Sequence, residues 1–363
     1  MYSILVKPIL FSLDPEQAHE LTLHKMHLAS KQRLLLKLIE KLFGSKVPEL
    51  PVTCMGIEFA NPVGLAAGLD KDACALPAFS ALGFAGVELG TVTPKPQDGN
   101  PKPRMFRLLE DKGLINRMGF NSCGVDQFLL NLKPIEKSAV VGINIGKNAV
   151  TSIEDAHFDY VSALQKVYSR ADYITVNISS PNTKSLRDLQ NADFLDNLLL
   201  KIKQTQKKCE KVHKRYVPIA LKVAPDLDSD EIETIAELLI SHKFDGLIAS
   251  NTTIDRPSSL QSKYAPEGGG LSGAPVKDKS TECIRQFYKI LKGHVQIIGV
   301  GGIANADDAW EKMLAGADFL QIYSLFIYQG PAMIADIVKG LQSKLDEHGY
   351  DDIATAMAAL RKN

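Results

Sequence analysis

Short apolar segments recur eight times along this chain, and they restrict its possible folds more than any other feature. Each is too short for a core helix and ends in glycine or polar residues, and most are followed by an amphipathic segment of helical length. The eight segments are residues 62–67, 86–90, 140–145, 173–178, 218–223, 246–249, 295–300 and 319–322. Continuous apolar strands that alternate with helices are typical of parallel sheets. Eight such units predict an α/β fold, a (β/α)8 TIM barrel, with an open doubly wound sheet as the main alternative.

Two parts of the chain lie outside this repeat. Residues 93–120 contain four prolines and are too long for a simple loop, so we expect an insertion over the reactive face of the barrel. Residues 1–47 predict a small N-terminal helical hairpin, with one helix starting at Asp14-Pro15 and a second over residues 31–43. The predicted division is 1–47 for the hairpin, 48–345 for the barrel with its insertion at 93–120, and 346–363 for a C-terminal tail.

The predicted hairpin has two possible roles. It carries seven Lys/Arg and four Asp/Glu, an excess of three positive charges, in a chain of zero net charge. Such helices either pack on the barrel or a second copy, or lie on an anionic membrane and admit a lipid-soluble ligand. No run of about 18 apolar residues predicts a transmembrane span.

Charge and cysteine content exclude some classes of function. Zero net charge gives no reason to expect binding to nucleic acid. The five cysteines are scattered, without a CxxC pair or other metal-ligand spacing. They predict reduced thiols in a cytosolic setting and no metal site.

Glycine-rich loops after the seventh and eighth segments predict a phosphate site. Gly299-Val300-Gly301-Gly302 follows the seventh segment, and Tyr323-Ser324 follows the eighth. Barrels hold phosphate at these loops through backbone N–H groups. The Rossmann and P-loop patterns are absent, which favours a mononucleotide or sugar phosphate. A plain turn is the alternative interpretation.

Two lysines are candidates for pairing with an anion. Lys71 follows the first segment, and Lys222 lies inside the fifth. A buried lysine is costly unless it meets an anion, and a reduced flavin carries negative charge beside N1. Alternatively, Lys222 forms a Schiff base as in barrel aldolases, and Lys71 is a solvated loop charge.

Further polar side chains gather at the same predicted face. Five asparagines would suit a cyclic ureide with alternating N–H and C=O groups, and these are Asn116, Asn144, Asn177, Asn182 and Asn251. Ser180 is the candidate base, and Thr183 could continue a hydroxyl or water relay. An acyl-enzyme mechanism is not favoured, because no His or Asp is adjacent in sequence and a GxSxG elbow is absent. The alternative is that Ser179 and Ser180 merely cap a turn.

Three classes of function are compatible with these residues. The first is a flavin-dependent redox enzyme. The second is a phosphate-binding isomerase or aldolase with Lys222 as an amine catalyst. The third is a peripheral membrane scaffold, although a scaffold has no use for the asparagines and Lys222.

Taken together, the motifs resemble those of the membrane-associated, quinone-dependent (class 2) dihydroorotate dehydrogenases. The motifs are GLAAGLDKD at 64–72, GTVTP at 90–94, LINRMGF at 114–120, NISSPNT at 177–183 and GVGGI at 299–303. They cover nearly the whole chain in order. The resemblance implies oxidation of (S)-dihydroorotate to orotate in pyrimidine (UMP) biosynthesis, with FMN as cofactor and a membrane quinone as electron acceptor.

The resemblance also implies roles for individual residues. FMN would contact Ala66, Ala67, Gly68, Leu69, Asp70, Thr91, Asn144, Asn177, Lys222, Ser250, Gly273, Gly302, Tyr323 and Ser324. The substrate would contact Lys71, Asn116, Arg117, Met118, Gly119, Phe120, Asn177, Asn182, Asn251 and Thr252. Ser180 takes the position of the base that removes the C5 proton while hydride leaves C6 for flavin N5. His19 and Arg107 would flank the quinone.

Two features favour class 2 over class 1 within this resemblance. Class 1 relatives use a cysteine as the base and lack the hairpin, whereas the loop at 177–183 contains no cysteine. The resemblance implies that the hairpin forms the mouth of a quinone tunnel. It places the protein peripherally on the cytoplasmic face of the cell (inner) membrane, and we expect a monomer because the hairpin face would be committed to lipid.

Overall fold

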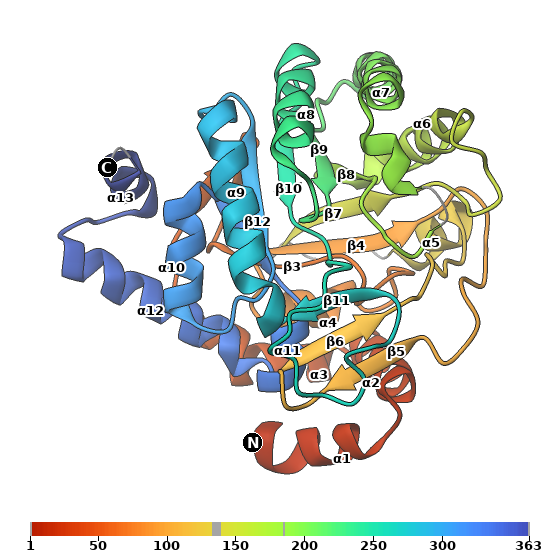
Figure 1. Ribbon diagram of the computed structural model, residues 1–363. Helices are drawn as coiled ribbons and strands as arrows, with labels where there is room; N and C mark the ends of the chain where they lie inside the picture. The colour runs from red at the N-terminus through yellow and green to blue at the C-terminus, as the bar shows by residue number, and fades with distance from the viewer. Residues whose placement is uncertain (1, 133–138, 184–185, 362–363) are drawn as a thin grey trace.

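Eight parallel strands close into a barrel in the computed structural model, which describes residues 2–132, 139–183 and 186–361 (Figure 1). The strands are β3 (Val63–Leu65), β4 (Gly86–Val92), β7 (Val140–Ile145), β8 (Tyr173–Asn177), β9 (Ile219–Val223), β10 (Gly246–Ala249), β12 (Gln296–Val300) and β13 (Phe319–Ile322). They pair in chain order, and β13 pairs with β3 to complete the ring. The predicted (β/α)8 TIM barrel is confirmed, and the open sheet is excluded.

Helices surround the barrel because each has one apolar face to bury. They are α4 (Leu76–Ala81), α5 (Val125–Asn131), α6 (Ala156–Val167), α7 (Ala192–His213), α8 (Ser229–Ser241), α9 (Lys277–Leu291), α10 (Ala306–Ala315), α11 (Ser324–Gln329) and α12 (Ala332–His348). A capping box starts α8, since Asp228 accepts from the Glu231 backbone N–H and Glu231 accepts from that of Asp228. A last helix, α13 (Ile353–Leu360), buries Ile353 and Met357 where the sequence offered no motif.

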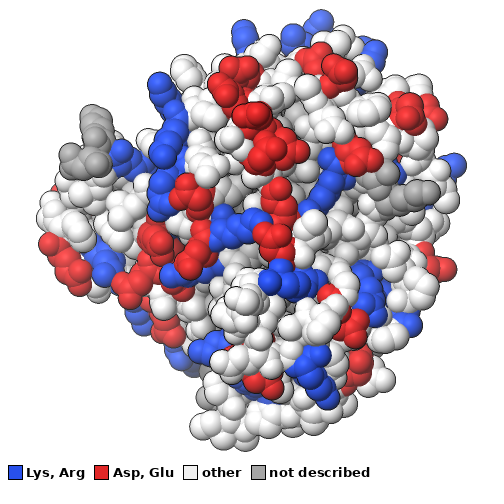
Figure 2. Space-filling view, viewed as in Figure 1, with Lys and Arg blue, Asp and Glu red and all other residues white. Residues whose placement is uncertain are grey.

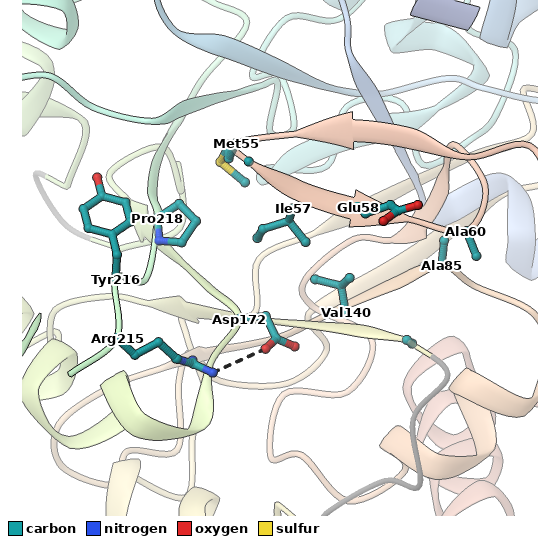
Figure 3. A pocket seen from close by; sticks show the side chains of 12 residues that line it. Met55, Ile57, Glu58, Ala60, Ala85, Val140, Asp172, Arg215, Tyr216 and Pro218 are labelled. Atoms are coloured by element: carbon teal, nitrogen blue, oxygen red, sulfur yellow. Dashed lines mark ion pairs between the residues drawn. The ribbon is translucent and has the colours of Figure 1, made fainter. Parts of the chain in front are cut away.

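A β-hairpin lies across the amino-terminal end of the barrel. It consists of β1 (Val52–Cys54) and β2 (Ile57–Phe59), and the Phe59 ring stacks on Phe319 with centroids 4.0 Å apart. Beside it lies an open hollow lined by Glu58 and Arg215 among others, where Arg215 pairs with Asp172 at 3.7 Å (Figure 3). In barrels this end contributes stability, whereas the opposite end carries the reactive groups.

The predicted insertion forms part of a separate three-stranded sheet. Strands β5 (Met105–Leu108) and β6 (Gly113–Asn116) come from residues 93–120, and β11 (Gly270–Gly273) joins them from the segment after β10. In Figure 1 this sheet lies below the barrel strands. It has its own small core of Phe106, Leu108, Ile115 and Leu271.

The N-terminal residues form a run of helices that packs against this sheet and against α4. They are a π-helical turn (Tyr2–Val6), α1 (Lys7–Ser12), α2 (Pro15–Ser30) and α3 (Arg33–Leu42). Asp14 caps α2 by accepting from the backbone N–H of Glu16 at 2.9 Å, so the predicted helix start is confirmed. The Glu16 carboxylate then pairs with Arg104 at 2.8 Å, with both side chains buried, and ties α2 to the insertion.

The outer side of these N-terminal helices is apolar. Large side chains are exposed at Ile4, Leu5, Ile9, Leu34 and Leu38. The surface over α1, at the bottom of Figure 2, has almost no charged groups. Among the described residues, no helix is both long and apolar enough to cross a bilayer.

Candidate active site

Two connected hollows lie at the carboxyl ends of the barrel strands. One lies under the small sheet, the other lies against the loops after β12 and β13, and both are bounded by Lys222, Asn251 and Tyr323. Most predicted site residues line them, namely Ala66, Ala67, Gly68, Lys71, Thr91, Asn116, Met118, Gly119, Phe120, Asn177, Ser180, Asn182, Lys222, Ser250, Asn251, Thr252, Gly273, Gly302, Tyr323 and Ser324. The barrel therefore brings residues from distant strand ends to one site.

A buried ion pair forms the floor of the site. The ammonium of Lys222 on β9 lies 4.0 Å from the carboxylate of Glu88 on β4, and both side chains are buried. Burial lowers the pKa of Lys222, and the Glu88 charge partly opposes that shift. Sequence analysis predicted that Lys222 would need an anion but did not identify Glu88. A carboxylate inside an apolar strand segment is the signal that could have found it.

Four neutral donors complete the surroundings of Glu88. Its carboxylate accepts from Asn144 and Gln321 at 2.8 Å, from Tyr173 at 3.0 Å and from Thr175 at 3.2 Å. These donors come from β7, β13 and β8, so the carboxylate connects strands around the barrel interior. A charge held by this many hydrogen bonds is fixed in position.

A chain of polar side chains leads from this floor to the candidate base loop. Asn144 donates to Glu88 and accepts from Thr91 at 2.6 Å, and Asn177 donates to Thr91 at 3.0 Å and to Asn144 at 3.1 Å. Asn144 does not line either hollow, although it orients two residues that do. The three side chains therefore have defined orientations before any ligand arrives.

The two serines of the loop after β8 differ in their hydrogen bonding. The Ser179 hydroxyl donates to Asn177 and accepts from Asn251, both at 2.8 Å. Ser180 lines the hollow under the small sheet, and its hydroxyl accepts from the Asn182 backbone N–H at 3.3 Å. Ser179 therefore holds the loop, and Ser180 belongs to the wall of the hollow.

Arg187 fastens this loop to its neighbour and was not found from the sequence. Its guanidinium donates to the carbonyls of Ser179 at 3.1 Å and Thr252 at 3.0 Å, and to the Asp226 carboxylate at 2.7 Å. Three bonds from one planar group fix the relative positions of the loops after β8 and β10.

Lys71 lies at the edge of the hollow under the small sheet. Burial, with the charge of Arg104, lowers the pKa of its ammonium to about 8. Its Nζ donates to the Asn121 side chain, and nearby Asn182 donates to Asn116 at 3.3 Å. This part of the site combines a cation with several amides, which suits a ligand that has a carboxylate and a polar ring.

The loops after β12 and β13 form a close-fitting backbone cradle. Gly302 has a φ of +69°, and a Cβ there would lie 2.6 Å from the Cα of Lys277 at the start of α9. Ser324 at the start of α11 donates to Ser272 at 2.8 Å, and both hydroxyls line the hollow. Backbone N–H groups, hydroxyls and glycine at this position fit a phosphate group.

Two residues missed by sequence analysis add to this part of the site. Ser272 on β11 lies between the hollows, and Gln321 on β13 lines the one beside the glycine loop. The Gln321 amide oxygen is buried without a hydrogen-bond partner among the described residues. A polar ring that offers a donor would satisfy this oxygen.

Five predicted residues besides Asn144 lie outside the hollows. Leu69 is buried, and Asp70 accepts from the backbone N–H groups of Cys74 and Ala75 at 2.8 Å, with burial raising the pKa of its carboxyl to about 6. Arg117 turns away to pair with Glu267 at 2.7 Å. The remaining two, His19 and Arg107, belong to the N-terminal side of the molecule.

His19 lies on α2, and Arg107 lies on β5 of the small sheet, where it contacts Phe11 of α1. Burial, together with the charge of Lys71, lowers the pKa of His19 on α2 to about 4. The Arg107 guanidinium lies over the Phe11 ring at 4.3 Å and donates to the Phe11 carbonyl at 3.2 Å. Its Nε is buried without a partner in the described parts of the chain.

Comparisons with known proteins agree with one another. The model of the dihydroorotate dehydrogenase family matches residues 49–345. A dihydroorotate dehydrogenase (quinone) of Acinetobacter baylyi is 52% identical over 94% of this chain and 99% of its own, and one of Vibrio vulnificus is 52% identical over 91% and 97%.

Solved structures from Eimeria tenella show the same similarity. A DHODH crystallised with ferulenol has a TM-score of 0.85 at 39% identity and covers 95% of each chain. The ligand-free type from the same organism has a TM-score of 0.85 at 38% identity and covers 96% of this chain and all of its own.

The buried pair at the floor of the site predicts a stability effect. Glu88→Gln keeps the shape and several hydrogen bonds but leaves Lys222 uncompensated, so we expect a loss of about 3 kcal/mol in the free energy of unfolding. Urea unfolding curves measure this loss. The matched control is Glu282→Gln, which removes an exposed pair with Arg285 and should cost less than about 0.5 kcal/mol. Equal losses in the two variants would contradict the assignment.

Proposed function

The chain belongs to the family of quinone-dependent dihydroorotate dehydrogenases, and we propose that it oxidises (S)-dihydroorotate to orotate with FMN as its flavin. The proposal continues with a membrane quinone as electron acceptor and a place in pyrimidine (UMP) biosynthesis. The observation that carries it is the placement of Ser180, Lys71 and the asparagines around a hollow whose floor is the Lys222–Glu88 pair. A proton acceptor, a cation and ring-binding amides meet at this one place.

The residues present fit FMN. Gly302, Gly273 and Ser324 would receive the phosphate, and Lys222 and Gln321 would face the polar edge of the ring. FMN supplies the acceptor, at N5, for the hydride that leaves C6 of the substrate. The nearby Glu88 carboxylate favours the charged ammonium form of Lys222, which is not nucleophilic. We therefore favour a role for Lys222 as a cation beside the flavin over a Schiff base.

The substrate would lie in the hollow under the small sheet. The Lys71 ammonium would pair with the substrate carboxylate, and Asn116, Asn182 and Asn251 would bind the ring. An amide near the C4 oxygen would stabilise the negative charge that develops there as the C5 proton leaves. The small sheet above would exclude water from the reacting atoms.

Ser180 would take the C5 proton on its hydroxyl oxygen while its own proton passes onward, with Thr183 as the predicted next member of the relay. The hydroxyl is a weak base, so the step depends on the acidity of C5 beside the developing enolate. Arg187 and Ser179 hold the loop that carries it. Loss of a proton at C5 and of a hydride at C6 leaves the C5–C6 double bond of orotate.

The N-terminal helices would lead the quinone to the site. Their exposed apolar residues suit the headgroup boundary of a bilayer, which is consistent with peripheral association on the cytoplasmic face of the cell membrane and with a monomer. His19 and Arg107 would flank the quinone head. The unpartnered Nε of Arg107 is a donor for a quinone oxygen.

An anaerobic visible spectrum tests the central proposal. We expect the purified protein to show a flavin band that bleaches when dihydroorotate is added. Ser180→Ala should slow this bleaching by about a hundredfold or more and leave FMN bound, because the variant lacks the base. Ser180→Cys should retain part of the rate, since a cysteine thiolate can also accept the proton. An unchanged rate in Ser180→Ala would refute the assignment of the base.

The pKa of Lys71 predicts the alkaline side of the pH profile. With a pKa of about 8, the group is an ammonium below that pH and neutral above it. Because only the ammonium attracts the substrate carboxylate, kcat/KM should fall about tenfold per pH unit above about 8. Stopped-flow reduction of the flavin measures the profile. In Lys71→Met, kcat/KM should be low and lack this decline, and a decline that persists would show that another group titrates.

Arg107 separates the two half-reactions. Arg107→Met should lower turnover with quinone by about tenfold or more while dihydroorotate still bleaches the flavin at the normal rate. Arg285→Met, on the exposed face of α9, is the matched control and should change neither rate. If both half-reactions of Arg107→Met slow equally, the residue supports the fold rather than quinone.

A further inference from the structure

A second lysine is buried behind the glycine loop that we assign to phosphate. Lys312 lies on α10 with no exposed surface. Its ammonium donates to the Ser280 hydroxyl, to the Thr281 hydroxyl at 2.9 Å and to the Lys277 carbonyl at 3.3 Å. All three acceptors are neutral and lie at the N-terminal end of α9, which runs beside α10 in Figure 1.

The charge of Lys312 is costly in this position. Burial lowers the pKa of its ammonium to about 7, although Glu311 and Asp308 on α10 and Cys283 on α9 raise it, and Lys277 on α9 lowers it further. Within the described ranges, Lys312 has no ion-pair partner of the kind that Glu88 provides for Lys222. An anion bound nearby would favour the charged form.

Hydrogen bonds connect this ammonium to the glycine loop. The Ser280 hydroxyl accepts from Lys312, and its own proton has two carbonyls in reach, Gly301 at 3.2 Å and Lys277 at 3.3 Å. Because the Lys277 carbonyl already accepts from Lys312 and from the Thr281 hydroxyl, the Gly301 carbonyl is the acceptor left for the Ser280 proton. That carbonyl belongs to the same peptide group as the Gly302 N–H, and a peptide that accepts a hydrogen bond becomes a stronger donor.

We propose that Lys312 is a positioning residue of the phosphate site: through Ser280 it polarises the Gly301–Gly302 peptide, and its buried positive charge stabilises a phosphate monoester at that loop. The inference rests on the proposed function, since FMN is the ligand that would bring the phosphate. It assigns to Lys312 the preference for FMN over riboflavin, which lacks the phosphate.

A purely structural role makes a different prediction. If Lys312 only joined α9 to α10, its loss would loosen the barrel wall and weaken both flavins alike. If it acts on phosphate, its loss weakens FMN alone. The ratio of FMN to riboflavin retention therefore distinguishes the two roles, and activity is not needed to measure it.

The experiment uses the full-length chain loaded with FMN or with riboflavin, and flavin release after dilution is followed by the recovery of fluorescence. Lys312→Met should accelerate FMN release about tenfold and leave riboflavin release unchanged. Ser280→Ala, which cuts the connection but keeps the lysine, should shift FMN release in the same direction by a smaller factor.

Lys147→Met is the matched control. Lys147 is also buried, donates only to the neutral carbonyls of Asn148 and Thr151 in the described chain, and follows β7, across the barrel from β12. Its loss should leave the FMN-to-riboflavin ratio unchanged.

Equal acceleration of both flavins in Lys312→Met, or acceleration of neither, would overturn the proposal. If Lys312→Met does not fold, Ser280→Ala decides, and an unchanged ratio in that variant overturns it as well. A wild-type chain that retains FMN no better than riboflavin would instead count against the phosphate site in the proposed function. The two failures are therefore distinguishable.

Discussion

The ion pair between Glu88 and Lys222 is the constraint on which the rest of the site depends. Two charges in the interior of a barrel are tolerated only when each compensates the other and the remaining lone pairs are satisfied. Here four further donors from three strands surround the carboxylate. The same side chains thus pack the barrel interior and form the floor of the active site. A substitution among them affects both stability and the site.

Above this floor, the site is built from loops that hold one another. Arg187 joins the loops after β8 and β10, Ser179 fixes the backbone beside Ser180, and the small sheet covers the hollow. Arg187 and Ser179 thus hold the loops of the hollow without lining it themselves. The rigid barrel strands and these supporting side chains together fix the positions of the irregular loops that line the hollow.

The sequence predicted the barrel because strands buried on both sides are continuous apolar segments. Residues 140–145, 246–249 and 319–322 coincide with β7, β10 and β13. The partners of Glu88 and Arg187 could not be predicted, since they depend on contacts between segments far apart in the chain. The same holds for β11, whose pairing with β6 joins residues about 150 positions apart, and for α13, which lies beyond the last recognisable motif.

That pairing has a consequence for how the enzyme can be assembled. The insertion belongs to the first half of the barrel and β11 to the second, so the covered hollow exists only when both halves are present. Ser180 emerges from the ribosome just after β8, whereas β11, which completes the small sheet over the hollow, emerges much later. The covered hollow is therefore complete only late in synthesis, and a half-barrel would leave it open.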